Sequence, residues 1–299
     1  MSAKLNLDFY TGTDYYSDGN IESELLELMK NHDDHDDYSE ILNKDDRWPI
    51  LYHLSPIRQN ILNWYPFKEN ASCLEIGGGC GAITGVLCKN LAKVTVVELS
   101  KRRASINYER HKTYSNLEIM VGNLNDIEFE EKFDYITLIG VLEYAGSFTK
   151  TDHPYSDFLK QIKKFLKPDG KLIIAIENRY GLKYFSGAKE DHTAKAFDGI
   201  TGYINNDTVR TFGKKELETL LETSGYPAQE FYYPHPDYKM PMEIHSSGWL
   251  PSENELLSPA PNYDYEKYEI FDQSQAFKGI ISNGQYEFFA NSFLVICGD

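Results

Sequence analysis

The sequence predicts an α/β protein whose parallel sheet is connected by crossover helices, and two observations support this fold class. Between residues 71 and 176, short apolar runs alternate with segments in which apolar residues recur at helical spacing, as in sheets whose strands are buried on both faces. The first apolar run leads into a glycine cluster, CLEIGGGCGAITG at residues 73–85. Glycines there allow the backbone to turn sharply from a strand into a helix.

The segment before the sheet, residues 1–66, is rich in tyrosine and acidic residues. Apolar residues recur at helical spacing in IESELLELMK and again in LYHLSPIRQNILNWY. We therefore expect an N-terminal helical cap at residues 1–66, followed by a second domain at residues 67–299.

The sheet itself is expected to contain five strands at the apolar runs SCLEIG, KVTVVE, NLEIMVG, FDYITLIG and KLIIAIE. Helices with one apolar face are expected between them in AITGVLCKNLA, SKRRASINYERH and SDFLKQIKKFLK. Ser100 is the expected N-cap of the second helix. Pro168, Asp169 and Gly170 are expected to end the third helix and to turn the chain into the next strand.

The segment after the sheet begins with a long loop and continues with the helix KKELETLLETSG, which Gly225 closes. Two further strands are expected in QEFYYPHPDY and in YEFFANSFLVICG. About 50 residues separate these strands, which is too long for a normal hairpin loop. We therefore expect an insertion with its own small structure at about residues 238–286.

The glycine cluster fits two kinds of cofactor site. As Gly77-x-Gly79-x-x-Ala82, with Glu98 at the end of the next strand, it matches the dinucleotide-binding fingerprint. Glu75, just before the glycines, favours the second kind. Its carboxylate would repel the pyrophosphate of a dinucleotide but attract the sulfonium and ammonium groups of S-adenosylmethionine.

As Glu75-x-Gly77-x-Gly79-x-Gly81, the cluster resembles the first motif of class I S-adenosylmethionine-dependent methyltransferases. The segments VTVVELS, VGNLND, FDYITLIGVLEYAG and LKPDGKLIIAIEN resemble later motifs of this family in their order and spacing. The resemblance implies a Rossmann-like sheet of seven strands with the last strand antiparallel, and S-adenosylmethionine as the cofactor.

The resemblance also implies which residues bind the cofactor. Glu98 is expected to accept hydrogen bonds from both ribose hydroxyls. Asn123 stands where the family usually has Asp, and its carbonyl oxygen is expected to meet the adenine amino group. The complete expected set is Glu75, Gly77, Gly79, Gly81, Glu98, Leu99, Asn123, Leu124, Ile139 and Gly140.

The loop after the fifth strand offers one candidate for a general base. If the methyl acceptor needs a base, we expect it to be His192 in KEDHT, with Asp191 or Glu190 orienting its ring. A solvent-exposed loop histidine is the alternative interpretation. The residues expected to contact the acceptor are Tyr144, Asn178 and Tyr16.

No metal ion is expected. The run HDDHDD at residues 32–37 is crowded and has polar flanks, which favours a solvated acidic loop over a metal site. Metal-dependent O-methyltransferases need an acidic residue after the fourth strand, and only Glu143 is present there. Glu177 and Asn178 on the fifth strand therefore lack an evident partner.

Further segments narrow the resemblance. YHLSPIRQNIL, IENRYGLKYFSGAKEDHT, FDGITGY and FANSFLV resemble a bacterial methyltransferase subfamily that is often fused or adjacent to glycosyltransferases of surface-polysaccharide synthesis. This resemblance implies O-methylation of a sugar, a glycan precursor or another small metabolite, and association with glycosyltransferases.

The composition limits the partners. A net charge of −16 disfavours nucleic acid. No apolar run is long enough for a membrane span and the first residues do not resemble a signal peptide, so we expect a cytoplasmic protein. An NAD-dependent oxidoreductase and a catalytically silent cofactor-binding partner of glycan-assembly enzymes remain the alternatives.

Overall fold

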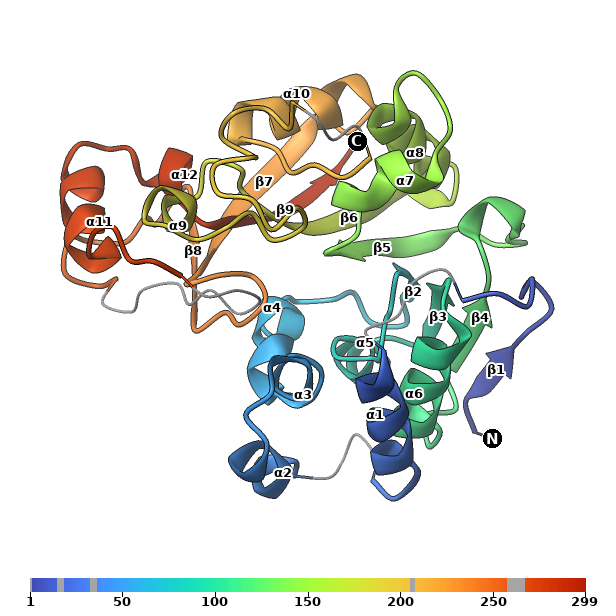
Figure 1. Ribbon diagram of the computed structural model, residues 1–299. Helices are drawn as coiled ribbons and strands as arrows, with labels where there is room; N and C mark the ends of the chain where they lie inside the picture. The colour runs from blue at the N-terminus through green and yellow to red at the C-terminus, as the bar shows by residue number, and fades with distance from the viewer. Residues whose placement is uncertain (1, 15–18, 33–36, 205–207, 257–266) are drawn as a thin grey trace. The chain divides into compact units, whose positions relative to one another are not determined.

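The computed structural model describes residues 2–14, 19–32, 37–204, 208–256 and 267–299 (Figure 1). The chain divides into two compact units. Unit 1 consists of Met1–Leu138 and Phe165–Gly170, and unit 2 consists of Ile139–Lys164 and Lys171–Asp299.

Unit 1 contains a parallel sheet in the order β1-β4-β3-β2-β5. Its central strand, β2, pairs with β3 on one side and with β5 on the other, so that Glu75 lies opposite Val96 and Thr137. The strands β2 to β5 are almost continuously buried, which explains their apolar runs. Their bounds are Lys4–Asn6 for β1, Ser72–Ile76 for β2, Lys93–Glu98 for β3, Leu117–Val121 for β4 and Phe133–Ile139 for β5.

The crossover helices of unit 1 are α5 (Thr84–Asn90) and α6 (Lys101–His111). Helix α6 begins directly after Ser100, whose hydroxyl accepts a hydrogen bond from the Arg103 N–H at 3.4 Å. The predicted N-cap is thereby confirmed. A short 3-10 turn, η2 (Leu124–Asp126), follows β4.

The N-terminal segment is mainly helical. Figure 1 shows α1 lying alongside α6, where the Glu22 carboxylate accepts from Nε of Arg103 at 2.8 Å. The strand β1 was not predicted, because three residues are too few to show a periodic pattern. The helices are α1 (Asn20–Lys30), α2 (Ser39–Lys44), α3 (Trp48–Leu54), η1 (Pro56–Gln59) and α4 (Asn60–Asn63).

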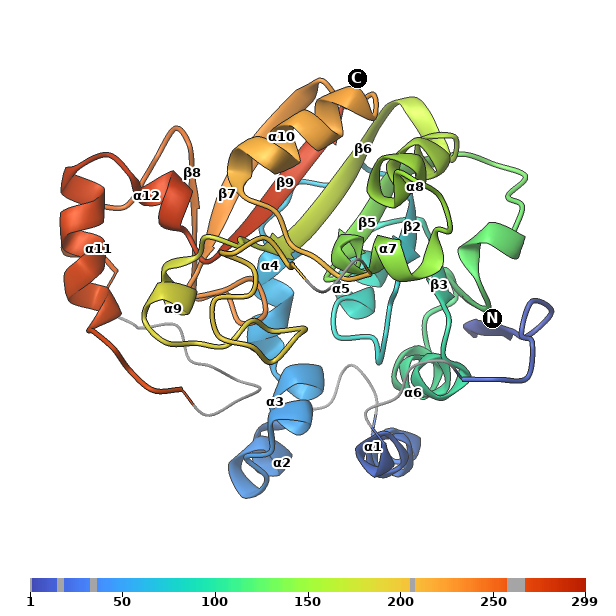
Figure 2. The same ribbon diagram turned by 45° about the horizontal axis from the view of Figure 1, so that its top comes forward.

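In unit 2, antiparallel pairing joins the strands in the order β6-β9-β7-β8. Figure 2 shows β6, β9 and β7 running side by side. The predicted antiparallel last strand is confirmed. The described residues contain nine strands, however, because the short strands β1 and β8 extend the strand order at its two ends, so the prediction of seven is not confirmed. The bounds are Leu166–Glu177 for β6, Ala228–His235 for β7, Glu243–Ser246 for β8 and Ser292–Gly298 for β9.

The strand β6 begins earlier than expected. Helix α8 (Pro154–Lys163) ends before Pro168, and Pro168 to Gly170 lie inside β6 instead of in a turn. Gly170 has a different role from the one predicted. A Cβ there would lie 3.0 Å from the Asp134 carbonyl oxygen, so this glycine allows two backbones to approach closely within the sheet.

Helices of unit 2 accompany these strands. The described part of the predicted insertion, residues 238–256 and 267–286, contains β8 and α11, and Asp272 caps α11 by accepting from Ser274 N–H at 2.8 Å. No helix among the described residues combines the length and the apolar composition that a membrane crossing needs. The helices are η3 (Leu142–Tyr144), α7 (Ala145–Phe148), α8 (Pro154–Lys163), α9 (Leu182–Phe185), α10 (Lys214–Thr223), α11 (Gln273–Ser282) and α12 (Tyr286–Phe289).

Candidate functional site

The glycine turn between β2 and α5 has a backbone that glycine adopts more easily than other residues. Gly77, Gly79 and Gly81 have φ angles of 73°, 53° and 82°. A Cβ at Gly79 would meet no atom within 4 Å, so the turn is open at this point. A Cβ at Gly81 would lie 2.5 Å from Oδ1 of Asn107 on α6. Gly81 therefore permits close packing on α6, whereas Gly79 leaves space beside the turn.

Glu98, the last residue of β3, connects this turn to the neighbouring strand. Its Oε2 accepts from the Gly79 N–H at 2.8 Å, and its Oε1 accepts from the Ser100 N–H at 2.9 Å. Burial raises the pKa of the Glu98 carboxyl, and these backbone hydrogen bonds oppose the rise. Because an ionised carboxylate offers about four acceptor positions, Glu98 retains the capacity to accept from ribose hydroxyls.

Glu75, near the end of β2, is a buried carboxylate with an exposed fraction of 4%. Its Oε2 accepts from the Thr84 hydroxyl at 2.6 Å, and the Thr84 oxygen accepts from Nδ2 of Asn107 at 2.9 Å. Burial raises the pKa of Glu75 to about 7, and the charge of Glu98 adds to the rise. A cation near Glu75 would stabilise the ionised form.

The residues after β4 and β5 complete the predicted cofactor set. Oδ1 of Asn123 accepts from the Asn125 N–H at 3.0 Å and has a second lone pair for another donor. Leu99 is half-buried and Leu124 is buried. Ile139 and Gly140 belong to unit 2. These cofactor contacts stay predictions.

A second polar group lies in unit 2, around His192. Its side chain is only 7% exposed, so the alternative of a solvent-exposed loop histidine is wrong. Nδ1 lies 3.0 Å from Oε1 of Glu190, and Nε2 lies 3.7 Å from Oε1 of Glu143. The ring of Tyr144 meets the imidazole edge to face, with 5.3 Å between the ring centres.

These carboxylates set the protonation of the ring. Burial lowers the pKa of His192, but the neighbouring carboxylates of Glu143 and Glu190 outweigh burial and raise the pKa well above its usual range. The imidazole is therefore protonated at neutral pH, and a base must first lose that proton. The role of His192 as a general base stays a prediction.

Glu177, at the end of β6, lies beside this histidine. The carboxylate is fully buried, and its Oε1 lies 3.1 Å from Nζ of Lys239. Burial raises the pKa of Glu177 to about 7, against the charge of Lys239. One ligand atom each of Glu143, Glu177 and His192 lies within 4.8 Å of the others. The expectation that Glu177 lacks an acidic partner is therefore wrong.

Asp191 has a different place from the one predicted for it. It lies between two buried lysines, 2.6 Å from Nζ of Lys239 and 3.1 Å from Nζ of Lys183. The Tyr184 hydroxyl donates to the same carboxylate at 2.5 Å. The pKa of Asp191 is lowered, because the two ammonium groups outweigh the effect of burial. Glu190, and not Asp191, contacts the ring of His192.

The other predicted acceptor contacts differ from one another. Nδ2 of Asn178 donates to the backbone oxygens of Phe288 and Ala290, both at 2.7 Å. Both of these donations use the amide nitrogen of a buried side chain. Asn178 is therefore less suited to bind the methyl acceptor than predicted. Tyr144 is half-buried, and its acceptor contact stays a prediction. Tyr16 and residues 33–36 of the HDDHDD run lie outside the described residues.

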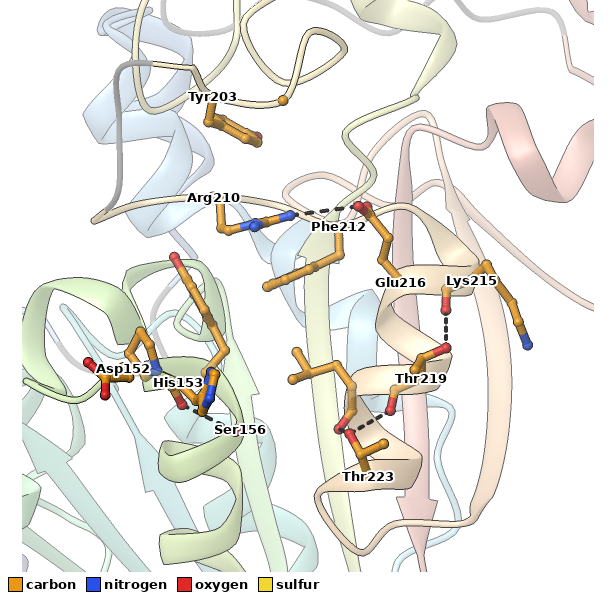
Figure 3. Close-up of a pocket in the computed structure, with 14 residues that line it drawn as sticks. Asp152, His153, Ser156, Tyr203, Arg210, Phe212, Lys215, Glu216, Thr219 and Thr223 are labelled. Carbon is orange, nitrogen blue, oxygen red and sulfur yellow. Dashed lines mark hydrogen bonds and ion pairs between the residues drawn. The ribbon is translucent and has the colours of Figure 1, made fainter.

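A pocket of about 790 Å³ lies in unit 2 between the start of α8, α10 and the loop before it (Figure 3). Arg210 reaches toward Glu216 across it, with 3.7 Å between Nη2 and Oε1. Two residues of its wall contact the group around His192. The Tyr203 hydroxyl donates to Glu190 at 3.1 Å, and the Arg210 N–H donates to the Glu143 backbone oxygen at 3.1 Å.

Comparison with known proteins assigns the chain to a family. Residues 51–230 match the methyltransferase domain family. The chain belongs to this family. The match confirms the prediction of a methyltransferase domain and supports S-adenosylmethionine as its cofactor. The family match therefore favours the S-adenosylmethionine interpretation of the glycine turn over the dinucleotide interpretation.

Individual relatives of this methyltransferase are distant. Malonyl-[acyl-carrier protein] O-methyltransferase of Priestia megaterium is 26% identical over 110 residues, which cover 36% of this chain and 38% of the relative. A methyltransferase of Staphylococcus carnosus is 34% identical over 114 residues, covering 38% of this chain and 51% of the relative. The chain thus spans about half or less of the length of these curated relatives.

Among solved structures, a chain of the complex between the Haloferax volcanii Trm112 methyltransferase activator and a methyltransferase is similar to this methyltransferase. The TM-score is 0.49 at 15% sequence identity, and the alignment covers 87% of this chain and 95% of the other. Because this TM-score lies below 0.5, the assignment of a Rossmann-like methyltransferase fold depends on the strand order and on the family match.

Sequence reasoning missed two features of the methyltransferase: the group around His192 and the pocket in Figure 3. Glu143, Glu177, Glu190 and His192 are up to 49 residues apart in the sequence. The available signal was that Glu143 and Glu177 each lie at or just after the carboxyl end of a strand, where polar side chains of α/β sheets gather.

Proposed function

We propose that this methyltransferase transfers the methyl group of S-adenosylmethionine to a hydroxyl oxygen of a sugar, a glycan precursor or another small metabolite. The observation that carries the proposal is the pair of buried carboxylates beside an open glycine turn: Glu75 before the turn, and Glu98 hydrogen-bonded to Gly79 within it. The preference for a sugar or glycan rests on the resemblance of segments such as KYFSGAKEDHT to the subfamily associated with glycosyltransferases.

The donor set fits S-adenosylmethionine. Glu75 is a carboxylate whose pKa of about 7 leaves it poised for a cationic partner, and the methionine part of the cofactor carries two positive groups. Glu98 has acceptor capacity for ribose hydroxyls. Oδ1 of Asn123 can accept from the adenine amino group. Gly77 and Gly79 have positive φ angles, which disfavour residues other than glycine. The turn therefore has no side chain at these two positions.

S-adenosylmethionine supplies an activated methyl group, so that the protein mainly has to bind, orient and exclude water. Holding the two reactants in line is worth several kcal/mol, on the order of 7–11 in favourable cases. A hydroxyl acceptor must in addition lose its proton. We propose that the buried group of Glu143, Glu177 and His192 accepts this proton, because two carboxylates and an imidazole lie together there.

We also propose that the protein associates with glycosyltransferases and acts in the cytoplasm. Both proposals rest on the resemblance and the composition described for the sequence. Co-purification with the products of neighbouring glycosyltransferase genes would test the association.

The test of the function is release of S-adenosylhomocysteine by the purified full chain in the presence of nucleotide sugars, glycans and small hydroxylated metabolites. We expect release with at least one hydroxylated acceptor, and a strong reduction in Glu98→Gln. Glu118→Gln, which changes a half-buried carboxylate of β4 that pairs with Lys4, is the control and should keep its activity. Binding of S-adenosylhomocysteine without turnover of any acceptor would instead support the catalytically silent alternative. Binding of NAD alone would contradict the proposal.

A further inference from the structure

We propose that Glu143, Glu177 and His192 form a binding site for one divalent transition-metal ion, such as Mn²⁺ or Zn²⁺. The site lies entirely within unit 2. Its occupancy can be measured without the methyl-transfer assay, so the proposal stands or fails separately from the proposed function.

The three ligands converge from separate segments. Glu143 lies in η3 after β5, Glu177 ends β6, and His192 follows in the next loop. One ligand atom of each lies within 4.8 Å of the others. Ligand atoms bound to one ion at about 2.1 Å lie up to ~4.2 Å apart. A shift of a few tenths of an ångström per side chain therefore brings them to coordination distance.

Two carboxylate oxygens of this group are available to a cation. Oε2 of Glu143 and Oε2 of Glu177 are buried, and no hydrogen-bond donor within the described part of the chain reaches either atom. The two residues have exposed fractions of 1% and 0%. Buried carboxylate oxygens without a partner are rare because they are costly, and a bound ion is one of their standard explanations.

The neighbouring lysines do not supply that cation. Lys183 pairs with Asp237 at 2.6 Å, and Lys239 pairs with Asp191 at 2.6 Å. Lys239 also approaches Oε1 of Glu177 at 3.1 Å but leaves Oε2 without a partner. Both ammonium groups are thus largely matched by aspartates.

The remaining charges are unbalanced. Once the two lysines are matched with the two aspartates, three carboxylates face one imidazole: Glu143, Glu177 and Glu190 around His192. Even with a protonated ring, the group has an excess of negative charge. A divalent cation that replaces the proton on Nε2 lowers this excess from two negative charges to one and gives the two unused oxygens a partner.

The histidine is already oriented as a ligand. Nδ1 faces Oε1 of Glu190 at 3.0 Å, while Nε2 faces Glu143. Metal-binding histidines characteristically donate the N–H of the other ring nitrogen to a carboxylate, which fixes the tautomer and the ring orientation. Glu190 is itself held by the backbone N–H groups of His192 and Thr193 at 2.8 and 2.7 Å and by the Tyr203 hydroxyl.

The ligand set selects the class of ion. One imidazole nitrogen with two carboxylates suits Mn²⁺, Fe²⁺ or Zn²⁺, whereas Mg²⁺ and Ca²⁺ favour oxygen ligands alone. Bound to an acceptor hydroxyl, such an ion would lower the pKa of that hydroxyl and make it a better methyl acceptor. This last consequence rests on the proposed function. His192 would then act as a ligand and not as a base.

The direct test is calorimetric titration of the full chain with MnCl₂ and with ZnCl₂ after dialysis against a chelator. We expect one ion per chain, and an affinity at least about 100-fold lower in the double variant Glu143→Gln/Glu177→Gln. The control with matched charge is Glu24→Gln/Glu40→Gln, which removes two exposed carboxylates and should bind the ion unchanged. Equal affinity in both double variants, or no stoichiometric binding at millimolar metal, would overturn the proposal.

Two further readouts keep the test independent of folding. Pulsed electron paramagnetic resonance of the Mn²⁺ complex should show coupling to an imidazole nitrogen that is lost in His192→Gln. Thermal unfolding should show that Mn²⁺ raises the Tm of the unmodified protein but not that of Glu177→Gln, when each protein is compared with the same protein without metal. If only organic ammonium ions raise the Tm, the site belongs to a cationic acceptor and the metal proposal is wrong.

Discussion

The main-chain N–H of Gly79 donates to Oε2 of Glu98 at 2.8 Å. This hydrogen bond joins the glycine turn after β2 to the end of β3, so the two parts of the predicted cofactor site hold each other in place. The main-chain N–H of Ser100 donates to the other oxygen, Oε1, of the same carboxylate. Glu98 is thus positioned by backbone before any ligand binds, and such preorganisation lowers the entropy that binding must overcome.

The first prediction concerns this carboxylate. Glu98→Ala should weaken binding of S-adenosylhomocysteine by about 100-fold, because hydrogen bonds to a charged group are worth about 1.5–3 kcal/mol. Glu98→Gln should have a smaller effect, since it keeps one acceptor. Calorimetry with S-adenosylhomocysteine measures both variants, with Glu118→Gln as the control. Affinity within twofold of the unmodified protein in Glu98→Ala would exclude the predicted ribose contact.

The second prediction concerns pH. With a pKa of about 7 in the free protein, Glu75 gains a proton as the pH falls through 7. The neutral carboxyl attracts a cation less than the carboxylate does. Binding of S-adenosylmethionine should therefore weaken as the pH falls from 8 to 6, by up to about tenfold per unit at the lower end. Glu75→Gln should flatten this dependence, and an unchanged slope in the variant would assign the titration to another group.

The same residue affects stability with the opposite sign. The folded-state pKa of Glu75 lies above the usual value of 4.5, so the folded protein binds more protons than the unfolded chain between pH 4.5 and about 7. The contribution of Glu75 to the free energy of unfolding must then fall as the pH rises through this range. Urea unfolding of the unmodified protein and of Glu75→Gln at several pH values isolates this contribution as a difference.

The third prediction separates two glycines of one turn. In Gly81→Ala, the new Cβ would lie 2.5 Å from Oδ1 of Asn107 and 2.7 Å from Cε1 of His111. We expect a loss of stability of about 3 kcal/mol or more, from overpacking and a positive φ angle together. Gly79→Ala has the positive φ angle but no clash and should cost only about 1–2 kcal/mol.

For cofactor affinity we expect Gly79→Ala to have the larger effect, whereas for stability Gly81→Ala has the larger effect. Because the space beside Gly79 is open, we expect a methyl group there to reduce affinity for S-adenosylhomocysteine even though the fold tolerates it. Urea unfolding and calorimetry on both variants provide the comparison. Unchanged affinity in Gly79→Ala would place the cofactor elsewhere.

The parts of the site that were predictable from the sequence are local. Glu75, the glycines and Glu98 follow from a strand, a turn and the next strand, and Ser100 follows from the start of a helix. These relations span fewer than 30 residues, and steric and capping rules apply to them directly. The expected adenine contact of Asn123 comes from the family resemblance and not from these local rules.

The remaining features depend on tertiary contacts. The burial of His192 between Glu143 and Glu190 requires segments almost 50 residues apart to meet, and no local pattern records this. Strands β1 and β8 have three and four residues, too few for a period-2 pattern to be recognised. The start of β6 was hidden by Pro168 and Gly170, which usually indicate a turn but here lie in the strand.

The fourth prediction tests Glu190 as the residue that holds the loop around His192. Its carboxylate accepts from the N–H groups of His192 and Thr193 and from the Tyr203 hydroxyl. Glu190→Ala leaves one buried and two partly buried donors without this partner, so we expect the free energy of unfolding to fall by about 3 kcal/mol or more. The control Glu222→Ala, on the exposed side of α10, should change it by less than about 0.5 kcal/mol. A similarly small change in Glu190→Ala would mean that the loop does not depend on this carboxylate.

The fifth prediction concerns turnover. His192→Ala should lower kcat by at least about 100-fold, the lower range for loss of an acid–base group. The affinity for S-adenosylhomocysteine should stay unchanged, since His192 is not among the residues expected to bind the cofactor. His192→Ala lowers turnover whether His192 is a metal ligand or a base. The Mn²⁺ affinity of the same variant decides between the two roles, because only loss of a ligand weakens metal binding. His32→Ala, at the end of α1, serves as the control. Unchanged turnover of His192→Ala at saturating acceptor would remove this histidine from the reaction in either role.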